Sequence, residues 1–239
     1  MEPEAYTELA RTEGRHWWFV GRREILAAFI AQLDLPSDAK ILEIGSGTGG
    51  NLEMLSRFGS VSAMEMDRQA LQIAKEKVPT VDIRAGTCPN EIPFSADRFD
   101  LVCMFDVLEH IQEDEATLSR VRELLSEGGR LLLTVPAYQS LWSAHDDFLH
   151  HKRRYTATLL EGKLGDAGLQ PLRISYFNTL LFPAAAAARS LARSRSPGAE
   201  IPAAPANMVL QTIFGAERWI LRWVNLPFGL SLIALATSK

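Results

Sequence analysis

The chain has 239 residues, of which 47% are apolar and 23% charged, with 25 Lys and Arg against 29 Asp and Glu. This length and composition exclude a disordered chain, a collagen-like chain and a coiled coil, and they allow one domain with a sizeable core. The only two cysteines, Cys88 and Cys103, lie outside any CxxC pattern. They exclude a disulfide scaffold and a cysteine zinc site, and a reducing compartment fits them best.

Charge is distributed unevenly along the chain. Residues 1–149 contain 14 Lys and Arg against 25 Asp and Glu, whereas residues 150–239 contain 11 against 4. A basic C-terminal part suits an anionic partner, although a solvated basic face would give the same count. We do not expect the acidic N-terminal run to be a signal peptide, and no charge-free stretch reaches the roughly 18 apolar residues of a membrane span. We therefore expect a cytoplasmic protein without a transmembrane segment, for which peripheral membrane contact stays open.

Short apolar runs alternate with helical stretches between residues 40 and 136. Strands are predicted at 40–44, 61–65, 81–84, 99–104 and 130–135, and helices at 50–57, 68–77 and 113–125. Asp67 occupies the N-cap position of the helix over 68–77. Strands that alternate with helices at this spacing indicate a parallel sheet that is covered on both faces.

The part of the chain after Pro136 has a different pattern. Thr158 and Glu161 match a capping box, which predicts a helix that runs to Ala167 and stops at Gly168. The remaining predictions are a strand at 172–176, a helix at 183–195, a proline-rich loop at 196–206, an amphipathic helix at 209–224 and a last strand at 230–236.

A glycine loop joins the first strand to the first helix of the alternating region. The run Glu43-Ile44-Gly45-Ser46-Gly47-Thr48-Gly49 has the pattern E-x-G-x-G-x-G, which differs from the G-x-G-x-x-G of dinucleotide enzymes. Glycines allow a sharp turn and a close approach of the backbone to a ligand. Glu65, at the end of the next strand, could accept both hydroxyls of a ribose. A tight turn without a ligand is the alternative interpretation.

These motifs resemble the class I S-adenosylmethionine-dependent methyltransferases over residues 40–136. The resemblance rests on five runs in order and at normal spacing: 41–49, 63–67, 86–94, 98–102 and 124–130. It implies an α/β fold with a Rossmann-like seven-stranded methyltransferase sheet, an antiparallel last strand, helices on both faces, and added N- and C-terminal helices. We expect one methyltransferase domain over 1–239, made of an N-terminal cover (1–36), a cofactor-binding core (37–136) and a substrate-side region (137–239) that holds a helical insertion and the last strands.

The same resemblance implies S-adenosyl-L-methionine as the cofactor. The residues expected to contact it are Glu43, Gly45, Ser46, Gly47, Gly49, Glu65, Met66, Thr87, Cys88 and Phe105. Two positions depart from the family pattern: Thr87-Cys88 stands where Asp is frequent, and Glu65 replaces the commoner Asp. In the preceding run His16–Arg23, Trp17 and Arg22 are the candidates for the site, with Arg22 near the methionine carboxylate, whereas Trp18 and Phe19 are expected to pack on the core.

A metal site is one interpretation of the segment 105–110, which follows the fourth strand. On a helix Asp106, Glu109 and His110 would lie on one face, although Asp106-x-x-Glu109 also matches a helix cap. The segment is similar to methyltransferases of ubiquinone biosynthesis and to those that methylate the 2′-hydroxyl at small-RNA ends, in which such residues and a later His bind a metal. That resemblance implies His151 as the fourth ligand, with His150 as second choice, and Mg, Mn, Zn, Ni or Fe as the metal. A polar loop with solvated charges is the alternative for this later stretch.

The function expected from these residues is methylation of a small molecule or of a glycan- or lipid-type acceptor, at oxygen first and at carbon or nitrogen as alternatives. A bacterial subgroup linked with such pathways is similar to this chain in its HWWFVGRRE run and its Arg-Arg-Tyr-Thr run. His110 or His151 would serve as the base in the absence of a metal, and Tyr155 and Arg154 would orient the substrate. The alternatives are an RNA 2′-O-methyltransferase, which the acidic overall charge disfavours, a non-catalytic S-adenosylmethionine-binding protein, and an enzyme that uses the cofactor without methyl transfer.

Overall fold

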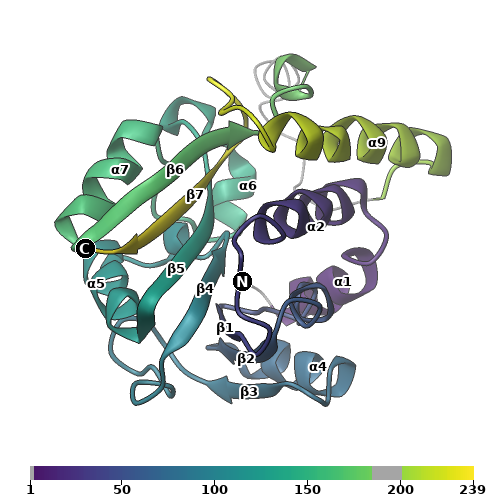
Figure 1. The fold of residues 1–239 in the computed structure, drawn as a ribbon. Helices are drawn as coiled ribbons and strands as arrows, with labels where there is room; N and C mark the ends of the chain where they lie inside the picture. The colour runs from purple at the N-terminus through teal and green to yellow at the C-terminus, as the bar shows by residue number, and fades with distance from the viewer. Residues whose placement is uncertain (1–2, 185–200) are drawn as a thin grey trace.

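The computed structural model describes residues 3–184 and 201–239, which form a layered α/β structure around one sheet (Figure 1). The sheet has seven strands in the order β3-β2-β1-β4-β5-β7-β6. β7 runs antiparallel to both of its neighbours, and the other pairs from β3 to β5 are parallel. This arrangement confirms the predicted fold. The strands are β1 (Lys40–Ile44), β2 (Ser60–Glu65), β3 (Asp82–Ala85), β4 (Phe99–Phe105), β5 (Leu125–Pro136), β6 (Leu169–Phe177) and β7 (Ser231–Ser238).

Helices precede the sheet, connect its strands and extend the last connection. They are α1 (Pro3–Thr12), α2 (Trp17–Ile30), α3 (Leu52–Leu55), α4 (Arg68–Lys77), α5 (Asp114–Leu124), α6 (Ala144–Phe148), α7 (Ala157–Asp166) and α9 (Ala204–Leu221), with the short 3-10 helices η1 (Leu108–His110) and η2 (Gln139–Leu141). Among the described residues, none of these helices is both long enough and apolar enough to cross a membrane.

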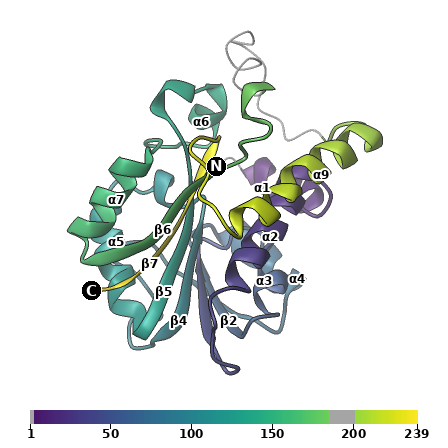
Figure 2. The same ribbon diagram turned by 45° about the horizontal axis from the view of Figure 1, so that its top comes forward.

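Two apolar clusters cover the two faces of the sheet. Val102 of β4 lies in one cluster with Val121 of α5 and Leu160 of α7. Its neighbour Leu101 points to the other face and lies with Leu26 of α2 and Phe214 of α9. Figure 2 shows α5 and α7 on one side of the sheet and α2, α4 and α9 on the other. Burial on both faces explains why the central strands read as continuous apolar runs in the sequence.

Several boundaries differ from the sequence predictions. The N-cap of α7 is Thr156, whose hydroxyl accepts a hydrogen bond from the Leu159 amide, so the capping box predicted at Thr158 is wrong. Thr156 has an extended backbone, as an N-cap requires, whereas Thr158 already lies inside the helix. α9 begins at Ala204, inside the stretch predicted as a loop over 196–206. Most of the helix predicted over 183–195 lies outside the described residues.

The N-cap predicted at Asp67 is confirmed. Its carboxylate accepts hydrogen bonds from the amides of Gln69 and Ala70, each at 2.9 Å. These bonds satisfy two of the amide groups that a helix leaves unpaired at its start. The cap fixes the beginning of α4 at Arg68, three residues after Glu65 ends β2, so the end of β2 and the start of α4 form a tight corner beside the glycine loop.

Candidate functional site

The glycine loop after β1 is held against the end of β2. The amides of Gly45 and Ser46 donate to the carbonyl of Met64, at 2.8 and 3.1 Å. The Gly47 amide donates to Oε2 of Glu65 at 2.8 Å, and Oε1 of Glu65 accepts from the Asp67 amide at 2.9 Å. The carboxylate predicted to bind a ribose therefore also fixes the loop. Each of its oxygens has a second lone pair, so it keeps acceptor capacity for a ligand.

Glycine is required at the three positions of the loop for different physical reasons. A Cβ on Gly45 would lie 2.6 Å from a methyl carbon of Val107, and one on Gly49 would lie 3.2 Å from Cβ of Ala74, so packing demands both. Gly47 has a φ of +55°, yet a Cβ there would meet nothing within 4 Å. Its missing side chain therefore leaves open space above the loop. That is the arrangement expected where a ligand approaches the backbone.

Several buried polar atoms near the loop, among them one of Glu43 and one of Arg22, lack partners among the described residues. Oε1 of Glu43 accepts from Nδ2 of Asn51 at 2.8 Å, but Oε2 has no partner among the described residues, and burial raises the pKa of Glu43 to about 8. Arg22 pairs with Asp106, and its guanidinium lies 4.5 Å from the centre of the Trp18 ring, while its Nε has no partner there. Buried polar atoms are rarely left unpaired, so both atoms fit a site that is completed by a polar ligand.

The other expected cofactor residues lie at the same edge of the sheet with different exposure. Ser46 and Phe105 are buried, and Met66 is exposed. Thr87 exchanges backbone hydrogen bonds with Glu91, and burial raises the pKa of the Cys88 thiol to about 11.

Trp17 lies against another element. Its ring contacts the edge of Phe214 of α9, with 5.8 Å between the ring centres, and its amide donates to Asn207 of the same helix. The described contacts of Trp17 therefore join α2 to α9. The ring that lies against Arg22 belongs to Trp18, which the sequence assigned to core packing.

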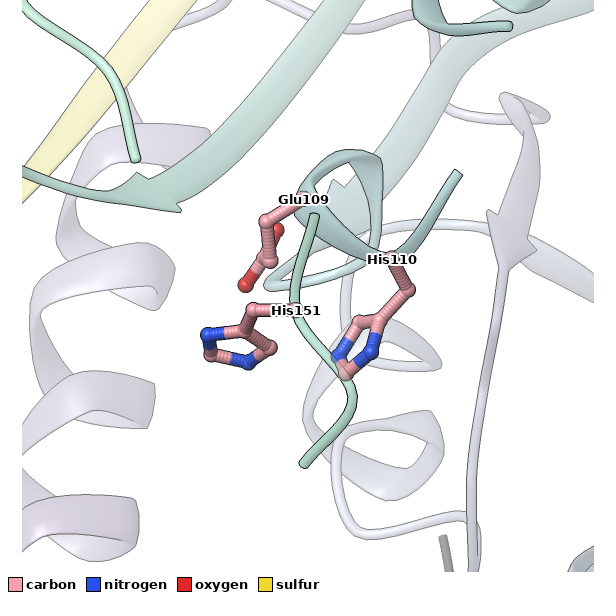
Figure 3. Close-up of side chains that lie close together, drawn as sticks. All are labelled: Glu109, His110 and His151. Carbon is pink, nitrogen blue, oxygen red and sulfur yellow. The ribbon is translucent and has the colours of Figure 1, made fainter. Parts of the chain in front are cut away.

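Glu109, His110 and His151 form a compact cluster of candidate metal ligands (Figure 3). One ligand atom from each residue lies within 4.8 Å of the other two. Glu109 is fully buried, and neither of its carboxylate oxygens has a partner among the described residues. Burial and the nearby Asp106 raise the pKa of Glu109 well above its usual value, whereas burial and His151 lower the pKa of His110 to about 3. The cluster therefore disfavours a proton on His110 and leaves a carboxyl group without a counter-charge.

Asp106 does not belong to this cluster, which corrects the predicted ligand set. Its backbone has a φ of +56°, and only residues 108–110 are helical, so the expected helical face over 106–110 is absent. The Asp106 carboxylate instead pairs with Arg22 and accepts from the hydroxyl of Thr134. The helix-cap alternative is wrong as well, because η1 has Val107 as its N-cap and no side-chain cap bond.

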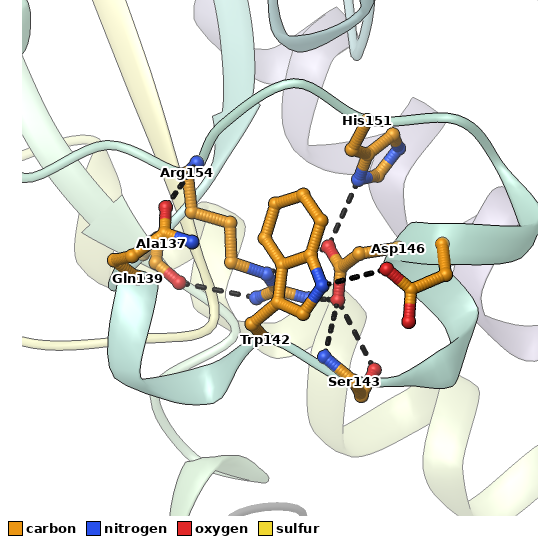
Figure 4. A network of polar contacts seen from close by, with 8 residues as sticks. Ala137, Gln139, Trp142, Ser143, Asp146, His151 and Arg154 are labelled. Carbon is orange, nitrogen blue, oxygen red and sulfur yellow. Dashed lines mark hydrogen bonds and ion pairs between the residues drawn. The ribbon is translucent and has the colours of Figure 1, made fainter.

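A buried network holds His151 in place (Figure 4). Nδ1 of His151 lies 2.9 Å from Oδ1 of Asp146. Asp146 is fully buried and also accepts from Nε and Nη2 of Arg154, at 2.7 and 2.9 Å, and from the backbone and hydroxyl of Ser143. These bonds hold the pKa of Asp146 well below its usual value. Because Nδ1 is engaged, Nε2 is the ring nitrogen left for a ligand, as in carboxylate-supported metal sites.

The roles expected for Arg154 and Tyr155 need correction. The Arg154 guanidinium donates hydrogen bonds to Asp146 and to the carbonyl of Ala137. Tyr155 is fully buried, and its hydroxyl donates to Asp114 at 3.0 Å. Neither side chain is free to orient a substrate, since each has its polar group engaged in the interior. The residue that the sequence prediction missed is Asp146, whose only signal was the Ser143-x-x-Asp146 capping pattern five residues before His151.

The structure brings His151, and not the exposed His150, to Glu109 and His110. His150 has a φ of +57° and lies at the end of the turn that follows α6. A one-residue difference in register thus decides which imidazole meets the cluster. The preference for His151 over His150 as a ligand candidate agrees with this geometry.

Comparison with known proteins places this edge of the sheet in context. A family model described as a methyltransferase domain matches residues 17–174. The ubiquinone biosynthesis O-methyltransferase of Xanthomonas axonopodis pv. citri is 29% identical over 104 residues, and methyltransferase str2 of Strobilurus tenacellus is 25% identical over 201 residues. These matches cover 41% and 83% of this chain, but only 44% and 69% of the two relatives.

The fold has matches among solved structures too. A chain from the complex between the Haloferax volcanii Trm112 methyltransferase activator and a methyltransferase superposes with a TM-score of 0.64 and 17% identity. The superposition covers 98% of this chain and 97% of that chain. At this identity the likeness concerns the fold alone, and it extends over both the cofactor edge and the last strands.

Proposed function

The chain belongs to the S-adenosylmethionine-dependent methyltransferases, and from this premise we propose that it methylates an oxygen of a small-molecule, glycan or lipid-type acceptor with the help of a divalent metal. One observation carries the proposal: the buried Glu109 carboxyl, with both oxygens unpartnered, beside two imidazoles. The relative named for ubiquinone biosynthesis O-methylation supports oxygen as the acceptor atom.

The cofactor supplies an electrophilic methyl group on a sulfonium centre. We propose that Glu65 accepts the ribose hydroxyls, since it lies at the loop and keeps lone pairs beyond its bonds to Gly47 and Asp67. Glu43 and Arg22 would bind the charged amino-acid end, where their unpartnered oxygen and nitrogen gain partners. The residues thus position the methyl group, because alignment with the nucleophile is the main requirement of this chemistry.

Glu109, His110 and His151 would hold the cation. One carboxylate and two imidazoles suit Zn, Fe, Ni or Mn, and Mg less well, since Mg prefers oxygen ligands. A bound cation would lower the pKa of an acceptor hydroxyl, which makes it a nucleophile near neutral pH. Asp146 and Arg154 would keep His151 oriented with Nε2 available. Without a cation, an unprotonated imidazole of this cluster could accept the hydroxyl proton instead.

Metal binding can be tested before the acceptor is known. We expect the wild-type protein, stripped by a chelator, to bind Mn²⁺ in calorimetry, and the variant Glu109→Gln to lose that binding. Glu113→Gln, which changes an exposed carboxylate four residues along the chain, is the matched control and should bind Mn²⁺ normally. Equal Mn²⁺ binding by Glu109→Gln and wild type would contradict the metal assignment.

Activity provides the second readout. Methyl-labelled S-adenosylmethionine, offered with panels of hydroxylated aromatic, glycan and lipid-linked acceptors, should give labelled product that disappears on chelation and returns with added metal. Full activity of the chelated enzyme would contradict the metal-assisted mechanism and favour the mechanism in which a histidine acts as the base. Label in a small RNA added to the same panel would favour the RNA 2′-O-methyltransferase alternative, and cofactor binding without product in any arm would favour a non-catalytic protein.

A further inference from the structure

The connection between β6 and β7 is far longer than the sheet requires. The two strands are antiparallel neighbours, which a two-residue hairpin can join, yet residues 178–230 separate them. The described part of this excursion contains α9, which packs along α2 through Phe214 and Leu221 (Figure 1). Only one side of α9 is therefore packed on the rest of the domain.

Much of the surface of α9 that is not packed on α2 is apolar and exposed. Trp219 is 61% exposed and Trp223, just after the helix, is 78% exposed. The exposed large apolar side chains of this surface, which we call the α9 face, are Met208, Val209, Ile213, Trp219, Ile220, Trp223 and Val224. The one acidic residue of α9, Glu217, is fully buried and accepts hydrogen bonds from the amides of Asn178 and Leu180. Exposed apolar side chains gathered on one helix in this way are typical of an interaction site.

Two arginines border the α9 face. The guanidinium of Arg218 lies 5.1 Å from the centre of the Trp219 ring, and that of Arg222 lies 5.3 Å from the centre of the Trp223 ring. Both arginines, with Trp219 and Gln32, line a groove of about 250 Å³ between α2 and α9. Arg218 pairs with Glu24, whereas Arg222 has no acidic partner among the described residues. The edge of the face therefore offers a cation next to a groove.

We propose that the α9 face docks on an anionic lipid membrane, with the tryptophans at the headgroup boundary and Arg222 on a lipid phosphate. A helix with an apolar face, tryptophans on it and arginines along its edge is the pattern of an interfacial helix. The charges of α9 agree with this orientation, because its one acidic residue, Glu217, is buried, whereas Arg218 is partly exposed and Arg222 is exposed.

A second copy of the chain fits this surface less well than a membrane. A symmetric pairing of two α9 faces would bring their arginines together without acidic partners, since Glu217 is buried and Glu24 is already paired. An anionic bilayer supplies both the apolar phase and the negative charge that the face lacks. This inference goes beyond the proposed reaction and does not depend on it.

The test uses the full chain with vesicles of phosphatidylcholine alone or mixed with phosphatidylglycerol. We expect flotation with the anionic vesicles only, together with a blue shift of tryptophan emission. The variants Trp219→Glu and Trp223→Glu should each weaken partitioning about tenfold or more, the factor that burial of one large apolar side chain represents. Arg222→Gln should weaken it about fivefold, as expected for one cation near an anionic surface.

The matched control is Leu159→Glu on α7, which covers the opposite face of the sheet and is exposed to 44%. It should leave partitioning unchanged. The proposal is overturned if wild type does not bind anionic vesicles, or if Trp223→Glu binds them as well as wild type. A concentration-dependent dimer that Trp223→Glu abolishes, without vesicle binding, would assign the face to a second copy instead. Cofactor affinity measured on the same variants separates failure of docking from failure of the proposed function.

Discussion

The buried ion pair between Arg154 and Asp146 leads to the clearest prediction for stability. Asp146 is completely buried and Arg154 nearly so, and two hydrogen bonds of 2.7 and 2.9 Å join them. Methionine replaces the aliphatic part of the arginine side chain and carries no charge, so Arg154→Met would leave the Asp146 carboxylate buried with only His151 and Ser143 as partners. Removal of one partner from a buried pair costs about 3–5 kcal/mol, because the remaining charge is uncompensated.

Thermal and urea unfolding measure this loss. About 2–4 °C per kcal/mol is typical of a domain of this size, so the unfolding midpoint of Arg154→Met should fall by about 6–20 °C. The double variant with Asp146→Leu should recover part of the loss, since no unpaired charge remains. Arg120→Met, which breaks an exposed pair with Glu123 on α5, should change stability by less than about 1 kcal/mol.

The opposite outcome would refute the structural role of Arg154. If Arg154→Met kept the wild-type midpoint and the Mn²⁺ binding of the His151 cluster but lost methyl transfer, the arginine would act on the substrate, as the sequence alone suggested. The dependence on pH gives an independent check. The folded pKa of Asp146 is lowered, so its contribution to stability is present above the unfolded value of about 4 and is lost as the pH falls below it. The stability difference between wild type and Arg154→Met should therefore shrink in acid.

Two further predictions concern the cofactor edge. Gly47→Ala should weaken S-adenosylmethionine binding in calorimetry, because the new Cβ enters the open space at the loop. It should also cost about 1–2 kcal/mol of stability, because φ is +55° at this position. Gly162→Ala in α7 is the control and should stabilise the protein by up to about 1 kcal/mol. The pKa of Glu43 in the folded protein is about 8, above the ordinary value of 4.5, so the stability of the wild type should fall as the pH rises between these two values. Glu43→Gln should therefore be more stable than the wild type at pH 8 and similarly stable at pH 5. Unchanged cofactor affinity in the first variant, or a flat wild-type profile in the second case, would contradict the reasoning.

The sequence predicted those parts of the site that are set by local chemistry. The glycine pattern, the carboxylate about twenty residues later and the Asp67 cap all depend on a few neighbouring residues, and the structure assembles them at one corner. The parallel part of the sheet was predicted by the alternation of strands and helices, and the antiparallel last strand was implied by the family resemblance. The choice of His151, which the resemblance to metal-binding methyltransferases implied, agrees with its position beside Glu109 and His110.

The errors concern residues whose partners are distant in the sequence. Asp106 pairs with Arg22, which lies 84 positions earlier in the chain. No local sequence pattern predicts such a contact. Arg154 and Tyr155 lie in a polar run, which is typical of exposed residues. In the structure both are buried, and they hydrogen-bond to Asp146 and Asp114 respectively. A sequence pattern reports polarity, whereas burial depends on which opposite charge the fold brings near. Polar residues near a site are therefore the hardest to assign to substrate or to structure.

Asp106 connects the two halves of the candidate site. Its carboxylate pairs with Arg22 on the side of the glycine loop, and its charge also raises the pKa of Glu109 in the cluster with His110. Two carboxyl groups this close repel each other when both are ionised, and Arg22 offsets only part of that repulsion. Under the proposed function, a cation held by Glu109 would offset this repulsion, so Asp106 would favour its binding without being one of its ligands.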